Sequence, residues 1–272
     1  MAPFGRILLP VDLSERSLDS ARQAEVLARH FHSEVTILHV VDPHEQEFGR
    51  FEPGGVKAHE LEMLLARDFT EASISRLVRD GNPAREILDF AEANRVGLIV
   101  MASHGYGPFE SFLLGSVTAE VLRDANCPVW ITAHTRPGPP PMFRNVLCAV
   151  DLGPGSENVV NWASQFAAAF AARFSVLHVL RSLESGEQPD SPDEWLSQMD
   201  REELGKLKRK LGKEDQVFFV GGSVPQAVCH RAKDIHADLV VIGRSPKADD
   251  VGTARTTSFE IIREAPCPVV SV

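Results

Sequence analysis

The amino-acid sequence predicts an α/β protein of two tandem, doubly wound domains, each a five-stranded, mainly parallel sheet with helices on both faces. The chain has 272 residues, which is enough for two domains of ordinary size. A set of landmarks recurs in the second half of the chain, and within each half short apolar segments alternate with amphipathic ones. Such alternation is typical of parallel sheets whose strands are joined by helical crossovers.

An internal repeat with a period of about 140 residues sets the domain organisation. An apolar segment ending in Val-Asp-Leu opens each half and places an aspartate at Asp12 and at Asp151. A second apolar segment carries His39 in the first half and His178 in the second, and both halves close with the triplet Cys-Pro-Val. Because all these landmarks keep one register, we expect the two halves to share one fold.

The elements of the first half follow from periodicity and from helix-start signals. Ser14, followed by an acid, predicts a helix N-terminus, and apolar residues up to Phe31 give this helix one buried face. Pro83 suits the first turn of a helix, and the run Leu98–Met101 is apolar on both faces, as in a covered parallel sheet. The expected elements are strand 6–13, helix 14–31, strand 35–40, a long loop over 42–55, helix 57–68, strand 74–78, helix 84–93, strand 98–101, helix 116–124 and strand 129–132. The second half repeats this order, with a longer helix over 192–210.

A proline-rich segment, His134-Thr-Arg-Pro-Gly-Pro-Pro-Pro141, separates the halves. Proline fixes φ and removes a backbone donor, so this segment is expected to be a stiff, extended connector. We therefore predict a first domain over 1–134, a linker over 135–143 and a second domain over 144–272.

Composition limits the classes of partner. The formal net charge of −10 argues against a broad nucleic-acid surface, which needs clustered Lys and Arg. The N-terminus reads as neither a signal peptide nor a membrane span, and no apolar run approaches 18 residues, so we expect no membrane partner. The cysteines lie far apart without a Cys-x-x-Cys pair, which favours buried, reduced thiols in a cytoplasmic protein. They are Cys127, Cys148, Cys229 and Cys267.

A candidate anion site lies in the first half. Open parallel sheets bind ligands at the carboxyl ends of their strands, and Asp12, Val40 and the loop after Met101 all fall there. Gly105 and Gly115 permit positive φ or a close backbone approach. Residues 116–118 then present amides without intrahelical acceptors, and two hydroxyls, at a helix start, where the helix dipole favours negative charge.

Other motifs fit less well. The P-loop needs a lysine after its last glycine, and the dinucleotide fingerprint needs a third glycine where Glu110 stands. A nucleophile elbow around Ser103 would need glycine at Met101, and the neighbouring His104 is poorly placed to act on it. The strand histidines, His39 and His178, are expected to be hydrogen-bonded interior residues. No catalytic residue and no metal-ligand set is predicted.

With these motifs in register, the sequence resembles the universal stress protein family over nearly its whole length, in two copies. The ATP-binding branch of that family carries Gly-x-x-Gly, nine residues, then Gly-Ser or Gly-Thr. Here Ala102 stands at the first glycine, Gly105 at the second, and Gly115-Ser116 follow after nine residues. The resemblance implies ATP, with or without Mg²⁺, in the first half. The implied contacts are Pro10, Asp12 and Val40 at the adenine and ribose end, Met101 and Ala102 at the pocket floor, and Gly105, Gly115, Ser116, Val117 and Thr118 at the phosphates.

Two departures from the family pattern lead to further expectations. If the Ala102 position requires positive φ, alanine weakens binding, whereas a position that needs only a small side chain tolerates it. In the second half, Gly243 matches the first glycine, but Pro246 replaces the second and Arg255 replaces the glycine before the helix. That half is therefore expected not to hold ATP in the same manner. Its basic loop residues Arg244, Lys247 and Arg255 either meet another anion or are solvated charges.

The closing strands suggest how the halves associate. Segments 129–132 and 269–272 are apolar sheet edges, and pairing them would protect both. The resemblance implies such an intramolecular pseudo-dimer, and also allows a homodimer of chains. The leading hypothesis is an ATP-binding regulatory or stress-response protein. The alternatives are a module that senses another small molecule or a protein instead of ATP, and a nucleotide hydrolase of the same superfamily.

Overall fold

The computed structural model divides the chain into two compact units, Met1–Pro141 and Met142–Val272. The described residues are 4–12, 14–42, 73–103, 114–132, 142–153, 155–180, 183, 191, 194–212, 214–244 and 253–272. The expected loop over 42–55 beyond Asp42, the expected helix over 57–68 and most of the expected linker lie outside these residues. Within the described part of the chain, no helix is long and apolar enough to cross a membrane.

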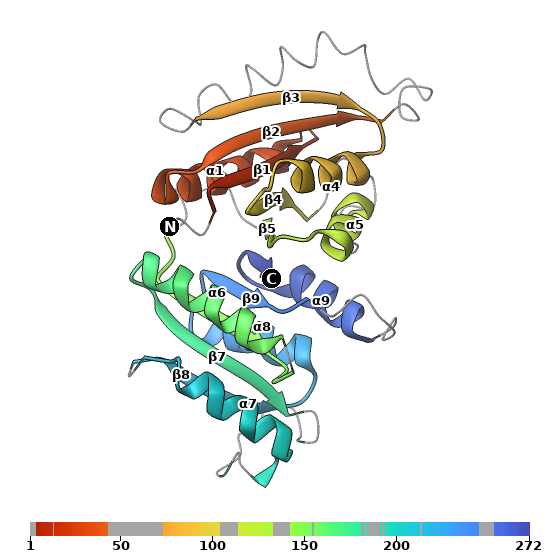
Figure 1. Ribbon diagram of the computed structural model, residues 1–272. Helices are drawn as coiled ribbons and strands as arrows, with labels where there is room; N and C mark the ends of the chain where they lie inside the picture. The colour runs from red at the N-terminus through yellow and green to blue at the C-terminus, as the bar shows by residue number, and fades with distance from the viewer. Residues whose placement is uncertain are drawn as a thin grey trace. The chain divides into compact units, whose positions relative to one another are not determined.

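The first unit contains a five-stranded parallel sheet in the order β3-β2-β1-β4-β5 (Figure 1). The described strands and helices follow the expected order, and the expected helix over 57–68 lies outside the described residues. The elements are β1 (Arg6–Val11), α1 (Glu15–Phe31), β2 (Glu34–Val41), β3 (Ile74–Asp80), α4 (Pro83–Ala93), β4 (Leu98–Ala102), α5 (Ser116–Asp124) and β5 (Val129–Thr132).

The crossover direction explains why both faces of this sheet are covered. The chain moves from β1 toward one edge through α1 and β2, then returns through β3 and α4 to the other side of β1. Since parallel crossovers are right-handed, α1 covers one face, and α4 and α5, which pack on each other, cover the opposite face. The central strands are consequently buried on both sides, and Leu8, Leu98 and Val100 are fully enclosed.

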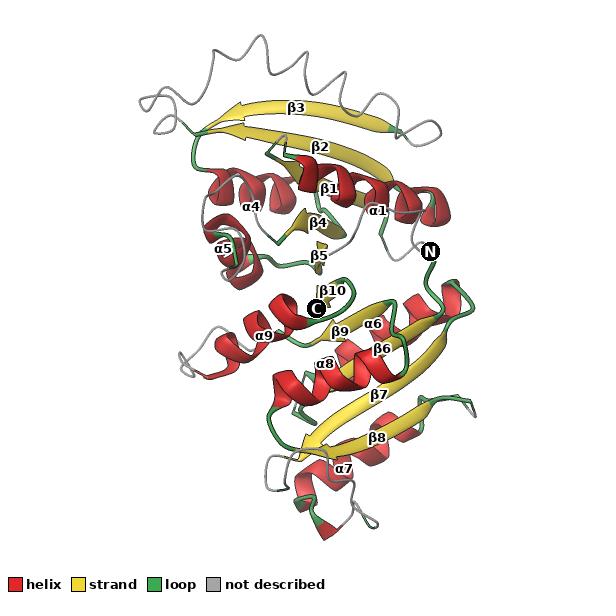
Figure 2. Cartoon of the chain, turned by 180° about the vertical axis from the view of Figure 1, so that it is seen from behind, coloured by secondary structure: helices red, strands yellow, loops and turns green. Residues whose placement is uncertain are grey.

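The second unit repeats this architecture with the strand order β10-β9-β6-β7-β8, again with every strand pair parallel (Figure 2). Its core includes Val146, Leu147 and Leu239, all fully buried. The elements are β6 (Asn145–Val150), α6 (Ser156–Ala169), β7 (Arg173–Leu180), α7 (Gln198–Lys208), β8 (Gln216–Gly221), α8 (Val224–Asp234), β9 (Leu239–Ile242), α9 (Thr253–Glu264) and β10 (Val269–Ser271). The predicted fold class, two doubly wound α/β domains in tandem, is confirmed.

Two helix starts differ from the sequence-based expectation. Helix α7 begins at Gln198, six residues later than expected, because Ser197 and Asp200 form a capping box at that point. Helix α9 begins at Thr253, so Arg255 lies inside its first turn and not before the helix. A local hydrogen-bonding pair decided the first boundary, which apolar periodicity alone did not mark.

The strand order locates the edge where a ligand can approach. In the first unit the strand order switches at β1: β2 and β3 lie on one side of it, and β4 and β5 lie on the other. In open α/β sheets the usual ligand position is at the carboxyl ends of the strands beside such a change in strand order. In the second unit the corresponding strands are β6 and β9.

Candidate functional site

Asp12 follows β1 and organises the turn into α1. Its Oδ1 atom accepts hydrogen bonds from the Ser14 amide at 3.1 Å, from the Ser14 hydroxyl at 2.6 Å and from the Ser17 hydroxyl at 2.5 Å. The Asp12 amide in turn donates to Ser17 Oγ at 3.1 Å. Ser14 occupies the N-cap position of α1, but its side chain makes no cap hydrogen bond. Ser14, which was expected to cap the helix, therefore donates its hydroxyl hydrogen bond to Asp12 instead.

The start of α5 is fastened to the end of β4. Gly115 is the N-cap residue, and its amide donates to the carbonyl oxygen of Ser103 at 3.0 Å. The Thr118 hydroxyl donates to the carbonyl oxygen of Ala102 at 3.1 Å, and the Thr118 side chain is buried. The Thr118 hydroxyl thus positions the helix. The donors that α5 offers at its start are the amides of its first turn, which helix geometry leaves without an intrahelical acceptor.

The backbone dihedral angles show whether the positions of Gly115 and Ala102 require a positive φ. Gly115 has φ −58° and ψ 143°, so this position does not need the left-handed region, and its glycine matters through the missing side chain. Ala102 is the last residue of β4 and is not among the described residues with positive φ. In the second unit Gly243 also lacks a positive φ, but a Cβ there would lie 3.2 Å from Val159 Cγ2. Alanine at 102 therefore carries no backbone strain.

The remaining predicted site residues fall at the same sheet edge, with one outside the described residues. Pro10 and Val40 are half-buried near the ends of β1 and β2, and Met101 is buried near the end of β4. Pro10 pairs in register with Leu38, and Met101 pairs with Ile131. Gly105 lies in the segment 104–113, outside the described residues.

The second unit keeps the aspartate turn but changes the end of the fourth strand. Asp151 Oδ1 accepts from the Gly153 amide at 2.8 Å and from the Ser156 hydroxyl at 3.0 Å, repeating the Asp12–Ser17 pair. After Gly243, the Arg244 guanidinium donates to the Ser271 carbonyl at 3.2 Å, so this cation folds onto the closing strand of its own sheet. Lys247 lies outside the described residues.

The two strand histidines have the expected interior role. His39 Nδ1 lies 2.8 Å from the Val11 carbonyl oxygen, and His178 Nδ1 lies 3.0 Å from the Val150 carbonyl oxygen. Both side chains are buried. Each histidine holds the end of one strand against the next, immediately before the aspartate turn of its unit.

Sequence reasoning missed Ser17 as part of the site, although a signal was present. A serine follows the turn aspartate by five residues in both halves, as Ser17 after Asp12 and as Ser156 after Asp151. In each unit the serine hydroxyl reaches back to the carboxylate from the first turn of the helix. The recurrence was visible in the repeat alignment, but the side-chain contact required the turn geometry.

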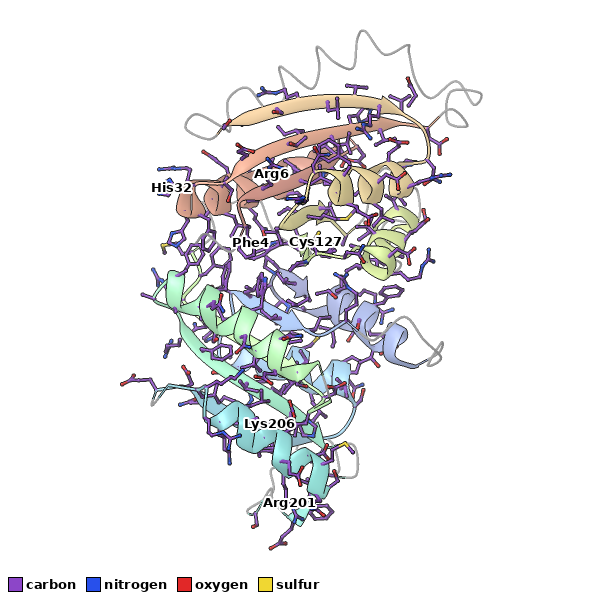
Figure 3. The ribbon with its side chains drawn as sticks, viewed as in Figure 1. Phe4, Arg6, His32, Cys127, Arg201 and Lys206 are labelled. Atoms are coloured by element: carbon purple, nitrogen blue, oxygen red, sulfur yellow. The ribbon has the colours of Figure 1, made fainter. Side chains whose placement is uncertain are left out.

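The cysteines are buried thiols for the most part. Burial raises the pKa of Cys229 to about 11, with the Glu264 carboxylate adding to the effect, and raises that of Cys267 to about 12. Burial likewise raises the pKa of Cys148. Cys127, two residues before β5, is partly exposed. Figure 3 labels its position. Among the described residues, no group of three or more His, Cys, Asp or Glu side chains is placed to hold a metal ion.

Taken with the strand order, these features define a doubly wound α/β domain that is present twice in the chain. The sequence profile described as Universal stress protein family matches residues 3–133 and again residues 142–272. The chain belongs to the universal stress protein family, and its two units are tandem copies of the family domain.

Individual relatives agree with this assignment. A universal stress protein of Methanocaldococcus jannaschii, MJ0531, is 32% identical over 139 residues, covering 47% of this chain and 81% of the relative. One from Thermus aquaticus is 30% identical over 132 residues, covering 46% of this chain and 96% of the relative. The crystal structure of a universal stress protein from Archaeoglobus fulgidus superposes with a TM-score of 0.73, covering 99% of this chain and 96% of that one. At 23% identity, that likeness supports the fold.

Proposed function

We propose that the first unit binds ATP at the carboxyl edge of its sheet, and that nucleotide occupancy regulates the conformation or the partners of the protein. The observation that carries this proposal is the start of α5, where the N-cap residue is a glycine without a capping side chain and where Thr118 fastens the helix to the end of β4, next to β1. Asp12 lies on the adjacent strand end, where a carboxylate can accept hydrogen bonds from a ribose or an adenine.

The chemistry of the α5 start fits a phosphate chain. The amides of Ser116, Val117 and Thr118 are the first-turn donors, and the positive end of the helix dipole favours an anion there. Gly115 places no side chain over them, and its own amide is already used by Ser103. Mg²⁺ bound with ATP can take most of its ligands from phosphate and water, so this site does not require a protein metal cluster.

The second unit does not offer the same site in our proposal. Arg244 follows the first glycine position, and its guanidinium and amide hydrogen bonds both go to β10 or the residue after it. Helix α9 begins with Thr253, so the bulky Arg255 belongs to the first turn, where the first unit has small residues. These differences support one ATP per chain.

The sharpest test is Gly115→Arg, which places a large side chain over the first-turn amides. Because Gly115 has a negative φ, an arginine at this position needs no left-handed backbone conformation. The matched control is Gly155→Arg, since Gly155 is also a helix N-cap with negative φ and has open space around its Cβ position. We expect isothermal titration calorimetry to detect ATP binding to the control and to the wild type, and none to Gly115→Arg.

A thermal-unfolding experiment separates the alternatives. ATP at a hundred times its dissociation constant should stabilise the wild type by about 2.7 kcal/mol. No shift at millimolar ATP, or equal binding by wild type and Gly115→Arg, would contradict the proposal and favour a module that senses another ligand. Release of phosphate, AMP or pyrophosphate in the same samples would instead support a hydrolase.

We also propose that the two units form an intramolecular pseudo-dimer through their closing strands. The support is that β5 and β10 are each the terminal strand of their own unit's sheet and are apolar, which makes an unpaired edge costly. Replacing Ile131 with lysine should expose this dependence by lowering the thermal stability of both units together. If the second unit of the variant unfolds separately, at the same temperature as in the wild type, the result would count against the pairing.

A further inference from the structure

Helix α1 carries a line of buried polar side chains on the face that packs against the sheet. Ser17, Ser20 and Gln23 are three residues apart, so they lie along one side of the helix. Their exposed fractions are 3%, 0% and 3%. Polar groups are rarely enclosed this completely unless they are hydrogen-bonded, so this line has a specific set of partners.

The three members of this polar line bond to the turn after β1 and to the closing strand β5. Ser17 Oγ contacts Asp12 at the proposed nucleotide site, as described above. Ser20 Oγ lies 2.8 Å from Thr132 Oγ1 at the end of β5. Gln23 Oε1 accepts a hydrogen bond from Trp130 Nε1 at 2.6 Å, also on β5. The line therefore runs from the site at β1 to the closing strand of the sheet.

The end of β4 is also connected to this polar line, through Thr132. Thr132 Oγ1 lies 3.5 Å from the carbonyl oxygen of Met101, which is the residue before the end of β4. Met101 lies near the end of β4 and Asp12 directly follows β1, and these two strands are neighbours in the sheet. The closing strand is thus connected to both sides of the proposed nucleotide site, once through the helix and once directly.

Burial makes these contacts act together. Breaking one of them leaves an enclosed donor or acceptor without its partner, which costs the full desolvation of that group. A displacement of α1 along its axis would break all three contacts at once, so the helix has one favoured register on the sheet. A shift imposed at Asp12 is therefore carried to β5 by a rigid helix and not absorbed between them.

The second repeat shows that the fold does not require this line. It keeps the first contact, between Ser156 and Asp151. At the positions that match Ser20 and Gln23 it has Val159 and Trp162, and when the Cys-Pro-Val triplets are aligned, Val270 and Val272 match Trp130 and Thr132. The unit with the altered strand-end loop therefore carries valine and tryptophan on the helix, and two valines on the closing segment, where the first unit has its polar contacts.

We infer that the polar line of α1 couples occupancy of the nucleotide site to the closing strand β5. Ser20, Gln23, Trp130 and Thr132 are positioning residues in this inference, because they act through α1 and not on the ligand. The inference rests on the proposed function and deepens it, since it names the element that responds to nucleotide. A ligand that changes the contacts of Asp12 changes α1, and α1 changes the environment of Trp130.

Tryptophan fluorescence tests this coupling directly. The chain has three tryptophans, so Trp162→Phe with Trp195→Phe leaves Trp130 as the single reporter. In this background, ATP should change the Trp130 emission with the dissociation constant that calorimetry gives. Hydrogen exchange should show altered protection of the β5 amides at the same concentrations.

The uncoupled variant combines Ser20→Ala, Thr132→Val and Gln23→Leu in the same background, so that both contacts between α1 and β5 are removed. Replacing both partners of the Ser20–Thr132 hydrogen bond with apolar groups of similar shape is close to neutral for stability, whereas Gln23→Leu removes the acceptor of the Trp130 Nε1 hydrogen bond and should lower the stability. We expect this variant to retain ATP binding in calorimetry, because Ser20, Gln23 and Thr132 are not among the proposed ligand contacts. Its Trp130 emission and β5 exchange should no longer respond. Val159→Ala, at the matching position of the second unit, should leave the response intact.

The outcomes distinguish the coupling from the proposed function. ATP binding by calorimetry without any change at Trp130 or β5, or an unchanged response in the uncoupled variant, would overturn the coupling alone. Absence of ATP binding would overturn the proposed function. In that case Asp12→Asn still tests the coupling, because it should shift Trp130 emission in the parent and not in the uncoupled variant. Equal shifts in the two proteins would overturn it.

Discussion

The hydroxyl of Thr118 donates a hydrogen bond to the carbonyl oxygen of Ala102 at 3.1 Å, joining the first turn of α5 to the last residue of β4. This bond fixes where the helix begins relative to the sheet edge. The first-turn amides, which are the proposed phosphate donors, are consequently held by a side chain that belongs to the same turn. The position of the first-turn amides therefore depends on the hydrogen bond between Thr118 and Ala102.

Thr118→Val should test that dependence. Valine keeps the shape of threonine but removes the donor, so the Ala102 carbonyl loses a partner. We expect a loss of about 1 kcal/mol in unfolding free energy, measured by urea denaturation, together with weaker ATP binding by calorimetry. Thr118→Ser retains the donor and should bind ATP nearly as the wild type does. If valine and serine behave alike, the hydroxyl does not position the helix.

Asp12→Asn and Asp151→Asn form a matched pair across the repeat. Each aspartate accepts a serine hydroxyl and a backbone amide in its turn, so both substitutions should weaken the turn and lower stability to a similar extent. Only Asp12→Asn is expected to weaken ATP binding, because the proposed ATP site lies in the first unit. Equal affinity losses in the two variants would place the ligand elsewhere or in both units.

Ala102→Gly restores the family residue at the first glycine position. Since Ala102 lies in a strand without positive φ, glycine relieves no strain there. We expect ATP affinity to change by no more than about twofold, while stability falls by roughly 0.5–1 kcal/mol from the added freedom of the unfolded chain. A large gain in affinity in calorimetry would show that the methyl group obstructs the site.

Thiol reactivity should follow burial and pKa. The thiolate is the reactive form, and a raised pKa lowers its fraction at every pH below that pKa. The pKa values of Cys229 and Cys267 are raised from 9.0 to about 11 and about 12, so both should stay largely protonated in the native protein at pH 8 to 10. Mass spectrometry after brief alkylation should find label on Cys127 first.

The same shifts affect stability at alkaline pH. A buried thiol with a raised native pKa favours the folded state below the unfolded value of 9.0, and this contribution is lost as the pH rises toward 11 to 12. Native protein should therefore lose unfolding free energy over that range. Rapid labelling of Cys229 at pH 8, without unfolding, would contradict the enclosed environment described above.

The sequence by itself determined the fold and the place of the candidate site. The repeat of Asp12 and His39 as Asp151 and His178 is a property of residue order, and alternating apolar periods specify strands and helices before any packing is known. The edge location follows as well, because parallel strands joined by right-handed crossovers bring their carboxyl ends together.

The tertiary structure alone decided the contacts that give the site its form. Residue order alone does not show that Ser14 donates to Asp12, that Thr118 bonds to Ala102 or that Gly115 has a negative φ, because these features depend on the geometry of the turn and of the helix start. The same holds for Ser20 and Gln23 of α1, whose partners lie more than a hundred residues away on β5. Hydrogen bonding acts over about 3 Å, so its partners are chosen only when packing has brought the elements together.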